Sequence, residues 1–68
     1  MYNKRNELNV FISAFKNRFG KTPNEYIARK ISTGSHIDDI KYLFNIIAVE
    51  IADKNQCKYF DFDNFYRS

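Results

Sequence analysis

The sequence predicts an all-α fold, a small bundle of three helices followed by a short aromatic helix or turn. Apolar residues recur at helical spacing in three stretches, and glycines and a Thr-Pro pair separate those stretches. The only stretch that alternates like a strand has no second strand to pair with. We expect helices over about residues 7–19, 23–31 and 36–53, in a single domain spanning residues 1–68.

The first predicted helix has a phenylalanine-rich apolar stripe. Its members fall within about 100° of one another on a helical wheel; they are Leu8, Phe11, Ile12, Phe15 and Phe19. Asn9, Ser13 and Asn17 face away from the stripe. Gly20 is expected to end this helix.

The second predicted helix has a strong start signal. Thr22 can cap it, Pro23 suits its first position, and Glu25 completes a capping box. We expect three of its residues to point inward, namely Tyr26, Ile27 and Ile31. Residues 32–34 read as a turn.

The third predicted helix has two apolar stripes on nearly opposite sides. Ser35 and Asp38 form a second capping-box pattern at its start. The core stripe comprises Ile37, Ile40, Phe44, Ile47 and Ile51. The other stripe comprises Tyr42, Ile46 and Val49. This helix is therefore either central in the fold or shared with a second copy of the chain.

The C-terminal aromatic segment fits two descriptions. It alternates like a strand in its first half, yet Tyr59, Phe62, Phe65 and Tyr66 also lie at helical spacing. We favour a short helix or turn, capped by Asp61, that closes over the core. Whether these rings are core or interface stays open at this point.

Composition argues against catalysis and against metal or cofactor binding. The single histidine, His36, sits beside a helix start and reads as a surface or capping residue. The carboxylate pairs belong to helix starts and turns, and no glycine-rich loop is present to hold phosphate. We expect no enzyme activity, no cofactor, no metal and no small-molecule substrate.

One cysteine and the lack of a long apolar run bear on location. Cys57 has no partner for an internal disulfide, which is typical of a reducing compartment. No stretch approaches the ~20 apolar residues of a membrane span. We therefore expect a cytoplasmic protein that does not enter membranes.

The two halves of the chain differ in charge. Residues 1–34 carry seven basic and two acidic side chains, whereas residues 35–68 carry four basic and six acidic ones. A basic half favours nucleic acid as a partner, although solvated charge on helix surfaces gives the same pattern. The candidate phosphate-binding residues are Lys16, Arg18, Lys21, Arg29 and Lys30.

The segment that joins the first two helices resembles the end of the second helix-turn-helix of AraC-type transcription regulators. The likeness covers about residues 10–31 and fixes, in one register, Phe15, Lys16, Gly20, Thr22, Pro23 and Tyr26. The resemblance implies that Lys16 lies beside DNA and that Phe15 and Tyr26 pack inside. The base-reading positions of the family fall here on Phe11, Ile12 and Ser13, so its usual Ser-Arg pair is absent. A phenylalanine-rich core helix followed by an ordinary helix junction is the alternative.

Two functions are compatible with these patterns. The first is a small DNA-binding protein of transcription regulation, which the charge asymmetry and the resemblance both favour. The second is a protein-binding modulator or inhibitor of a larger regulator or enzyme, of an accessory or phage type. The expected partner or homodimer surface comprises Tyr42, Ile46, Val49, Phe62, Phe65 and Tyr66.

Overall fold

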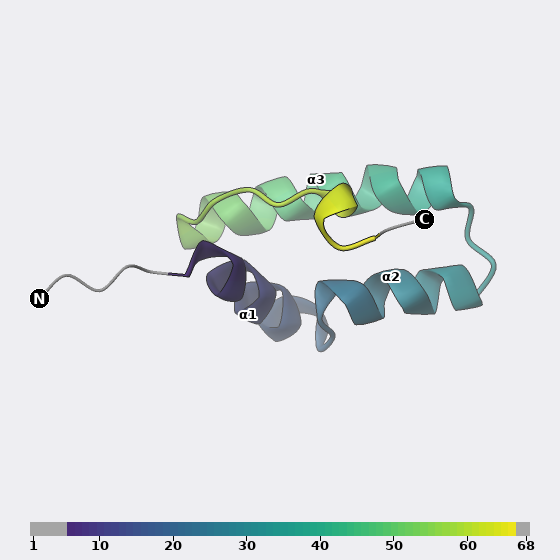
Figure 1. The fold of residues 1–68 in the computed structure, drawn as a ribbon, viewed down its shortest axis with the longest axis horizontal. Helices are drawn as coiled ribbons and strands as arrows, with labels where there is room; N and C mark the ends of the chain where they lie inside the picture. The colour runs from purple at the N-terminus through teal and green to yellow at the C-terminus, as the bar shows by residue number, and fades with distance from the viewer. Residues whose placement is uncertain (1–5, 67–68) are drawn as a thin grey trace, which may run out of the picture.

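A computed structural model describes residues 6–66, which form three α-helices and one short 3₁₀ turn (Figure 1). Helix α1 spans Glu7–Phe19, α2 spans Pro23–Ser32, α3 spans Ile37–Asn55, and the turn η1 spans Phe62–Asn64. α1 and α2 follow each other along one side of the molecule, and α3 runs back along the other. The C-terminal segment then reverses along α3 and carries η1. The predicted all-α bundle with a short aromatic end is confirmed.

Helix α1 begins and ends where the sequence predicts. The side chain of Asn6 accepts a hydrogen bond of 3.1 Å from the backbone N–H of Asn9. Gly20 adopts a left-handed conformation with φ of 74°, and its N–H donates to the carbonyl of Lys16. A side chain at this φ would be strained, so the glycine ends the helix at low cost.

Helix α2 begins with the predicted capping box. The Thr22 hydroxyl accepts from the backbone N–H of Glu25 at 3.3 Å, and the Glu25 carboxylate accepts from the backbone N–H of Thr22 at 2.9 Å. The bond from the Thr22 backbone is the largest cause that lowers the pKa of Glu25, and the Thr22 hydroxyl, Lys16 and Lys21 add to it. The cap therefore favours the ionised carboxylate.

Thr22→Ala is expected to destabilise the protein by about 1 kcal/mol, because the N–H of Glu25 then loses its acceptor.

Glu25→Gln tests the other half of the capping box through the pH dependence of the free energy of unfolding. The folded pKa of Glu25 lies below its ordinary 4.5, so its contribution is present above pH 4.5 and is lost as pH falls through the folded value. Denaturant unfolding across that range should show wild type and Glu25→Gln converging at low pH. A stability difference that is constant with pH would contradict this.

Helix α3 is capped by a different residue from the one predicted. Its N-cap is His36, whose Nδ1 accepts from the backbone N–H of Asp38 at 3.2 Å. The predicted capping box of Ser35 and Asp38 is therefore wrong: the imidazole nitrogen supplies the acceptor, and the backbone N–H of Ser35 donates to Lys30 instead. The prediction of a capping histidine is confirmed. The helix runs two residues beyond the predicted end. It ends at the C-cap residue Gln56, whose backbone adopts the left-handed conformation.

The core lies between α1 and α3 and is closed by α2 and η1. It consists of Phe11, Phe15, Ile27, Ile40, Phe44, Ala48, Ile51 and Phe62. Phe15 is at its centre, with ring centroids 4.9 to 6.2 Å from those of Phe11, Phe19, Tyr26 and Phe44. Three residues predicted to point inward are more exposed than expected, because they lie at the ends of helices; they are Leu8, Ile31 and Ile37.

The C-terminal segment is part of the core and is fixed by three long-range hydrogen bonds. The backbone N–H of Phe62 donates to Oδ1 of Asn45 at 2.9 Å. The side chain of Asn24 donates to the carbonyl of Phe65, and Glu7 accepts from the backbone of Lys58. These bonds join the segment to all three helices.

Of the three C-terminal rings predicted for a partner surface, Phe62 is buried in the core, whereas Phe65 and Tyr66 stay partly accessible. Phe62 is only 2% exposed and packs edge-on against Phe44. Phe65 and Tyr66 are half-buried against the same core. Asp61 stands at the predicted cap position of η1, but its carboxylate accepts from the Asn64 side chain rather than from the backbone.

Candidate functional site

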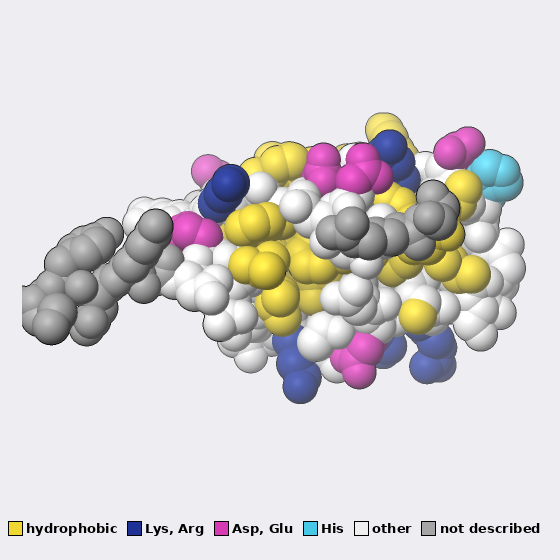
Figure 2. Space-filling view, in the orientation of Figure 1, with side chains coloured by type: hydrophobic (Ala, Val, Ile, Leu, Met, Phe, Trp, Pro, Cys, Tyr) yellow, Lys and Arg dark blue, Asp and Glu magenta, His cyan; other side chains and the backbone are white. Residues whose placement is uncertain are grey.

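Charge is distributed unevenly over the molecule. In the space-filling view, Lys and Arg side chains gather along the lower edge, over α1 and α2 (Figure 2). Asp and Glu side chains are more frequent along the upper edge, over α3. The predicted asymmetry in sequence is thus an asymmetry in space, and each edge is a candidate site of a different kind.

Four of the five predicted basic residues lie close together on α1, α2 and the turn between them. Lys21 and Arg29 line the same two shallow hollows, and Lys30 shares one of them. Lys16 and Lys21 both interact electrostatically with Glu25, which lines the second hollow. We call Lys16, Lys21, Arg29 and Lys30 the basic surface. Among the described residues none of these four forms a salt bridge.

Arg18 lies apart from the basic surface. It is two residues from Lys16 and therefore about 200° around the helix. Its guanidinium pairs with Glu50 of α3 at 3.5 Å and lies over the ring of Phe19. Arg18 thus connects α1 to α3, which sequence reasoning could not foresee because the partner is on another helix.

Uncharged polar residues occupy the exposed face of α1. Asn9, Ser13 and Asn17 recur every four residues, opposite the buried Phe11 and Phe15. Within α1, no acidic side chain falls on this face, and Lys16 lies at its edge. We call Asn9, Ser13 and Asn17 the amide face. The sequence placed these residues outward but gave them no role.

The outer side of α3 is apolar and exposed. Tyr42, Ile46 and Val49 have 68%, 52% and 57% of their surface exposed, as expected for the second stripe of a chain without a partner. Leu43, at 48%, belongs to the same surface and was not predicted. Leu43 lies three positions before Ile46 in the sequence, and this helical spacing could have assigned it to the surface. We call these four residues the apolar face of α3.

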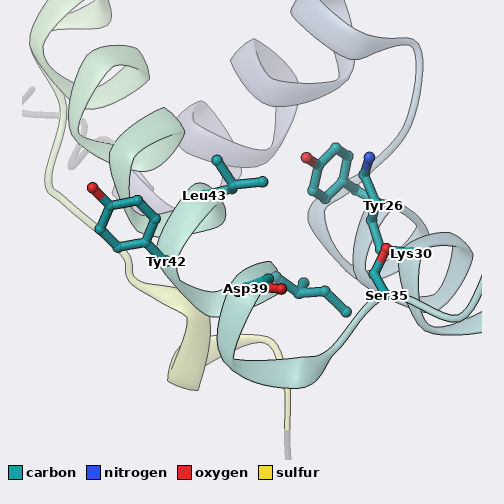
Figure 3. A pocket seen from close by; sticks show the side chains of 7 residues that line it. Tyr26, Lys30, Ser35, Asp39, Tyr42 and Leu43 are labelled. Carbon is teal, nitrogen blue, oxygen red and sulfur yellow. The ribbon is translucent and has the colours of Figure 1, made fainter.

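A hollow lies at each end of the apolar face. Near the start of α3, a pocket of about 400 Å³ opens between α2 and α3 (Figure 3). Tyr26 and Lys30 stand on its α2 side, and Asp39 and Leu43 on its α3 side. Burial raises the pKa of the Tyr26 phenol, which keeps its hydroxyl neutral. Near the end of α3, a shallower hollow is lined by Val49, Ala52, Asp53, Gln56, Cys57 and Tyr59.

Comparison with protein-family models, with curated proteins and with solved structures finds no match to this chain. The function must therefore be argued from the surfaces themselves. Within residues 6–66, none of the helices has the length and apolar composition that a bilayer span requires. The His, Cys, Asp and Glu side chains of that segment form no group of three that could hold a metal ion.

Proposed function

We propose that the protein binds nucleic acid in a regulatory role, with the amide face of α1 toward a duplex and the basic surface on its phosphates. The observation that carries the proposal is the clustering of Lys16, Lys21, Arg29 and Lys30, free of salt bridges, beside a helix face without acidic residues. Cations that form no salt bridge within the described residues are available to phosphate oxygens.

The amide face is suited to the base edges. Asparagine side chains can donate and accept hydrogen bonds at once, as the adenine edge in the major groove requires. An α-helix fits that groove, and α1 presents Asn9, Ser13 and Asn17 along one line. The resemblance to AraC-type regulators implies that Lys16 lies beside DNA, but its base-reading positions fall on Phe11, Ile12 and Ser13, and Phe11 is buried in the core. The proposed base contacts therefore rest on the exposed side of α1 and not on that resemblance.

Binding to a fluorescent duplex should weaken about 40-fold between 50 and 200 mM salt if three phosphates are neutralised. Lys16→Glu/Lys21→Glu/Arg29→Glu should abolish it, because each change turns a phosphate contact into a repulsion. Fluorescence anisotropy across the salt series measures both effects.

The matched control is Lys41→Glu/Lys54→Glu/Lys58→Glu, which makes the same change in net charge outside the basic surface. This variant should keep most of the affinity. Equal loss in the two variants would mean that net charge alone drives binding, and no binding at 50 mM salt would refute the proposal.

A second function, protein binding through the apolar face of α3, is favoured by the exposure of Tyr42, Leu43, Ile46 and Val49. Contiguous exposed apolar side chains mark interaction sites on small proteins. Either a second copy of the chain, as in the predicted homodimer, or a different protein would bind to this surface. Static light scattering at several concentrations distinguishes a constant 8.1 kDa mass from a dimer.

A further inference from the structure

We propose that the apolar face of α3 binds an amphipathic helix of another protein, one whose apolar stripe is flanked by lysine or arginine. This goes beyond nucleic-acid binding, because it involves a different face of the molecule, which meets the basic surface at Lys30, and a partner of different chemistry. The inference rests on three features: the length of the face, the hollows at its ends, and the sign of the charge around it.

The face has the dimensions of a helix-binding surface. α3 has 19 residues and is therefore about 28 Å long. Tyr42, Leu43, Ile46 and Val49 cover its middle two turns on the side away from the core. A partner helix lying along α3 would cover this stripe with residues spaced three and four apart.

The hollows provide anchor points for such a helix. The pocket and the hollow lie at opposite ends of the stripe. Tyr42, which lines the first, and Asp53, which lines the second, are separated by about three helical turns or 16 Å along α3. Large apolar side chains that fill pockets supply most of the energy at interfaces of this kind. The partner helix should therefore carry two bulky apolar residues about eleven positions apart, with smaller contacts over Ile46.

The apolar face of α3 has a carboxylate at each end. Asp39 lines the pocket at one end, on the α3 side and across from Lys30 of α2, and Asp53 lines the hollow at the other end, where no basic residue lines it. Among residues 6–66 neither carboxylate has an ion-pair partner, whereas Glu50 between them is paired with Arg18 and Lys54. Two unpaired carboxylates at the ends of an apolar stripe are complementary to a helix with basic flanks.

The same charges disfavour a second copy of this chain as the occupant. In an antiparallel pair with its two-fold axis at Ile46, Asp39 of each copy faces Asp53 of the other, seven residues from the axis on either side. In a parallel pair each aspartate faces its own equivalent. Both arrangements bring like charges together at an interface, which costs affinity.

Two synthetic helical peptides test the proposal on the full chain. Both carry the same leucine stripe with bulky residues eleven apart; one has lysine flanks and the other has glutamate at the same positions. In anisotropy titrations at about 50 mM salt, the lysine peptide should bind at least about tenfold more tightly. Amide chemical shifts should change along the outer side of α3 and not on the amide face of α1.

Substitutions test whether the peptide binds at the apolar face of α3 and whether the carboxylates at its ends set the preference. Ile46→Glu should weaken the binding of the lysine peptide at least about tenfold. Ser13→Glu, which adds the same charge at an exposed position of α1, should change the affinity by no more than about twofold. Asp39→Lys/Asp53→Lys should reverse the preference, so that the glutamate peptide binds more tightly. Ile46 is already half exposed, so its variant should remain folded.

Several results would overturn the proposal. Equal affinities for the two peptides, a preference that the aspartate variant does not reverse, or shift changes confined to α1 would each contradict it. A mass of twice 8.1 kDa in light scattering, with Ile46→Glu returning the monomer and no peptide binding to the wild type, would identify a second copy as the occupant.

Discussion

Phe15→Ala is expected to leave the chain largely unfolded. The ring is fully buried and contacts four other aromatic rings, from both α1 and its two neighbouring helices. Removing a buried phenylalanine costs about 3–5 kcal/mol, because apolar contacts are lost and a cavity remains. A chain of 68 residues has a total stability of about 3–10 kcal/mol. The substitution therefore removes a large part of it.

Thermal unfolding followed by circular dichroism measures this effect. Tyr42→Ala is the matched control, since it also truncates an aromatic ring on a helix but at a site that is 68% exposed. We expect that control to change stability by no more than about 0.5 kcal/mol. A Phe15→Ala protein that melts cooperatively at the wild-type temperature would show that this ring does not hold the core together.

Phe62→Ala is expected to have an effect of similar size, although Phe62 lies outside the three α-helices. Its ring is 2% exposed and lies between those of Phe44 and Tyr66, with centroid distances of 6.0 and 5.1 Å. We expect a loss of about 3–5 kcal/mol, measured by urea unfolding. The result would show that η1 completes the core.

Tyr59→Ala serves as the comparison, because it lies in the same segment but is 41% exposed. Its cost should be at most about half that of Phe62→Ala. If the two substitutions destabilise the protein equally, or if neither does, the C-terminal segment does not cover the core as described.

The local features of the fold could be predicted from sequence because each depends on neighbouring residues. The ends of α1 and α2 follow from Gly20 and from the capping box of Thr22 and Glu25, which act over three or four positions. The cap of α3 was missed because a histidine nitrogen took the place of the expected serine oxygen. Helical periodicity likewise identified both stripes of α3 and assigned one of them to the core, although it could not say whether the other is covered by the rest of the chain.

The parts that could not be predicted depend on contacts between distant residues. Phe62 was assigned to a partner surface because its spacing fits a helix face, yet the Asn45 side chain holds its backbone over the core. Arg18 was grouped with Lys16 as a phosphate-binding residue, although two positions along a helix already separate them by about 200°. Its ion pair with Glu50 of α3 could not be foreseen, because the partner is on another helix. Only a three-dimensional arrangement brings such partners together.

The positions of the two outer faces relative to the core bear on how this protein can assemble. Phe11 and Phe15 of α1 and Phe44 of α3 are buried in the same core, so the amide face of α1 and the apolar face of α3 both lie away from that core, on two different helices. Under the two proposals made above, a single copy would bind a duplex through α1 and α2 and a protein helix through α3. The chain would then act as an adaptor that brings a protein to nucleic acid, with Lys30 common to the two sites.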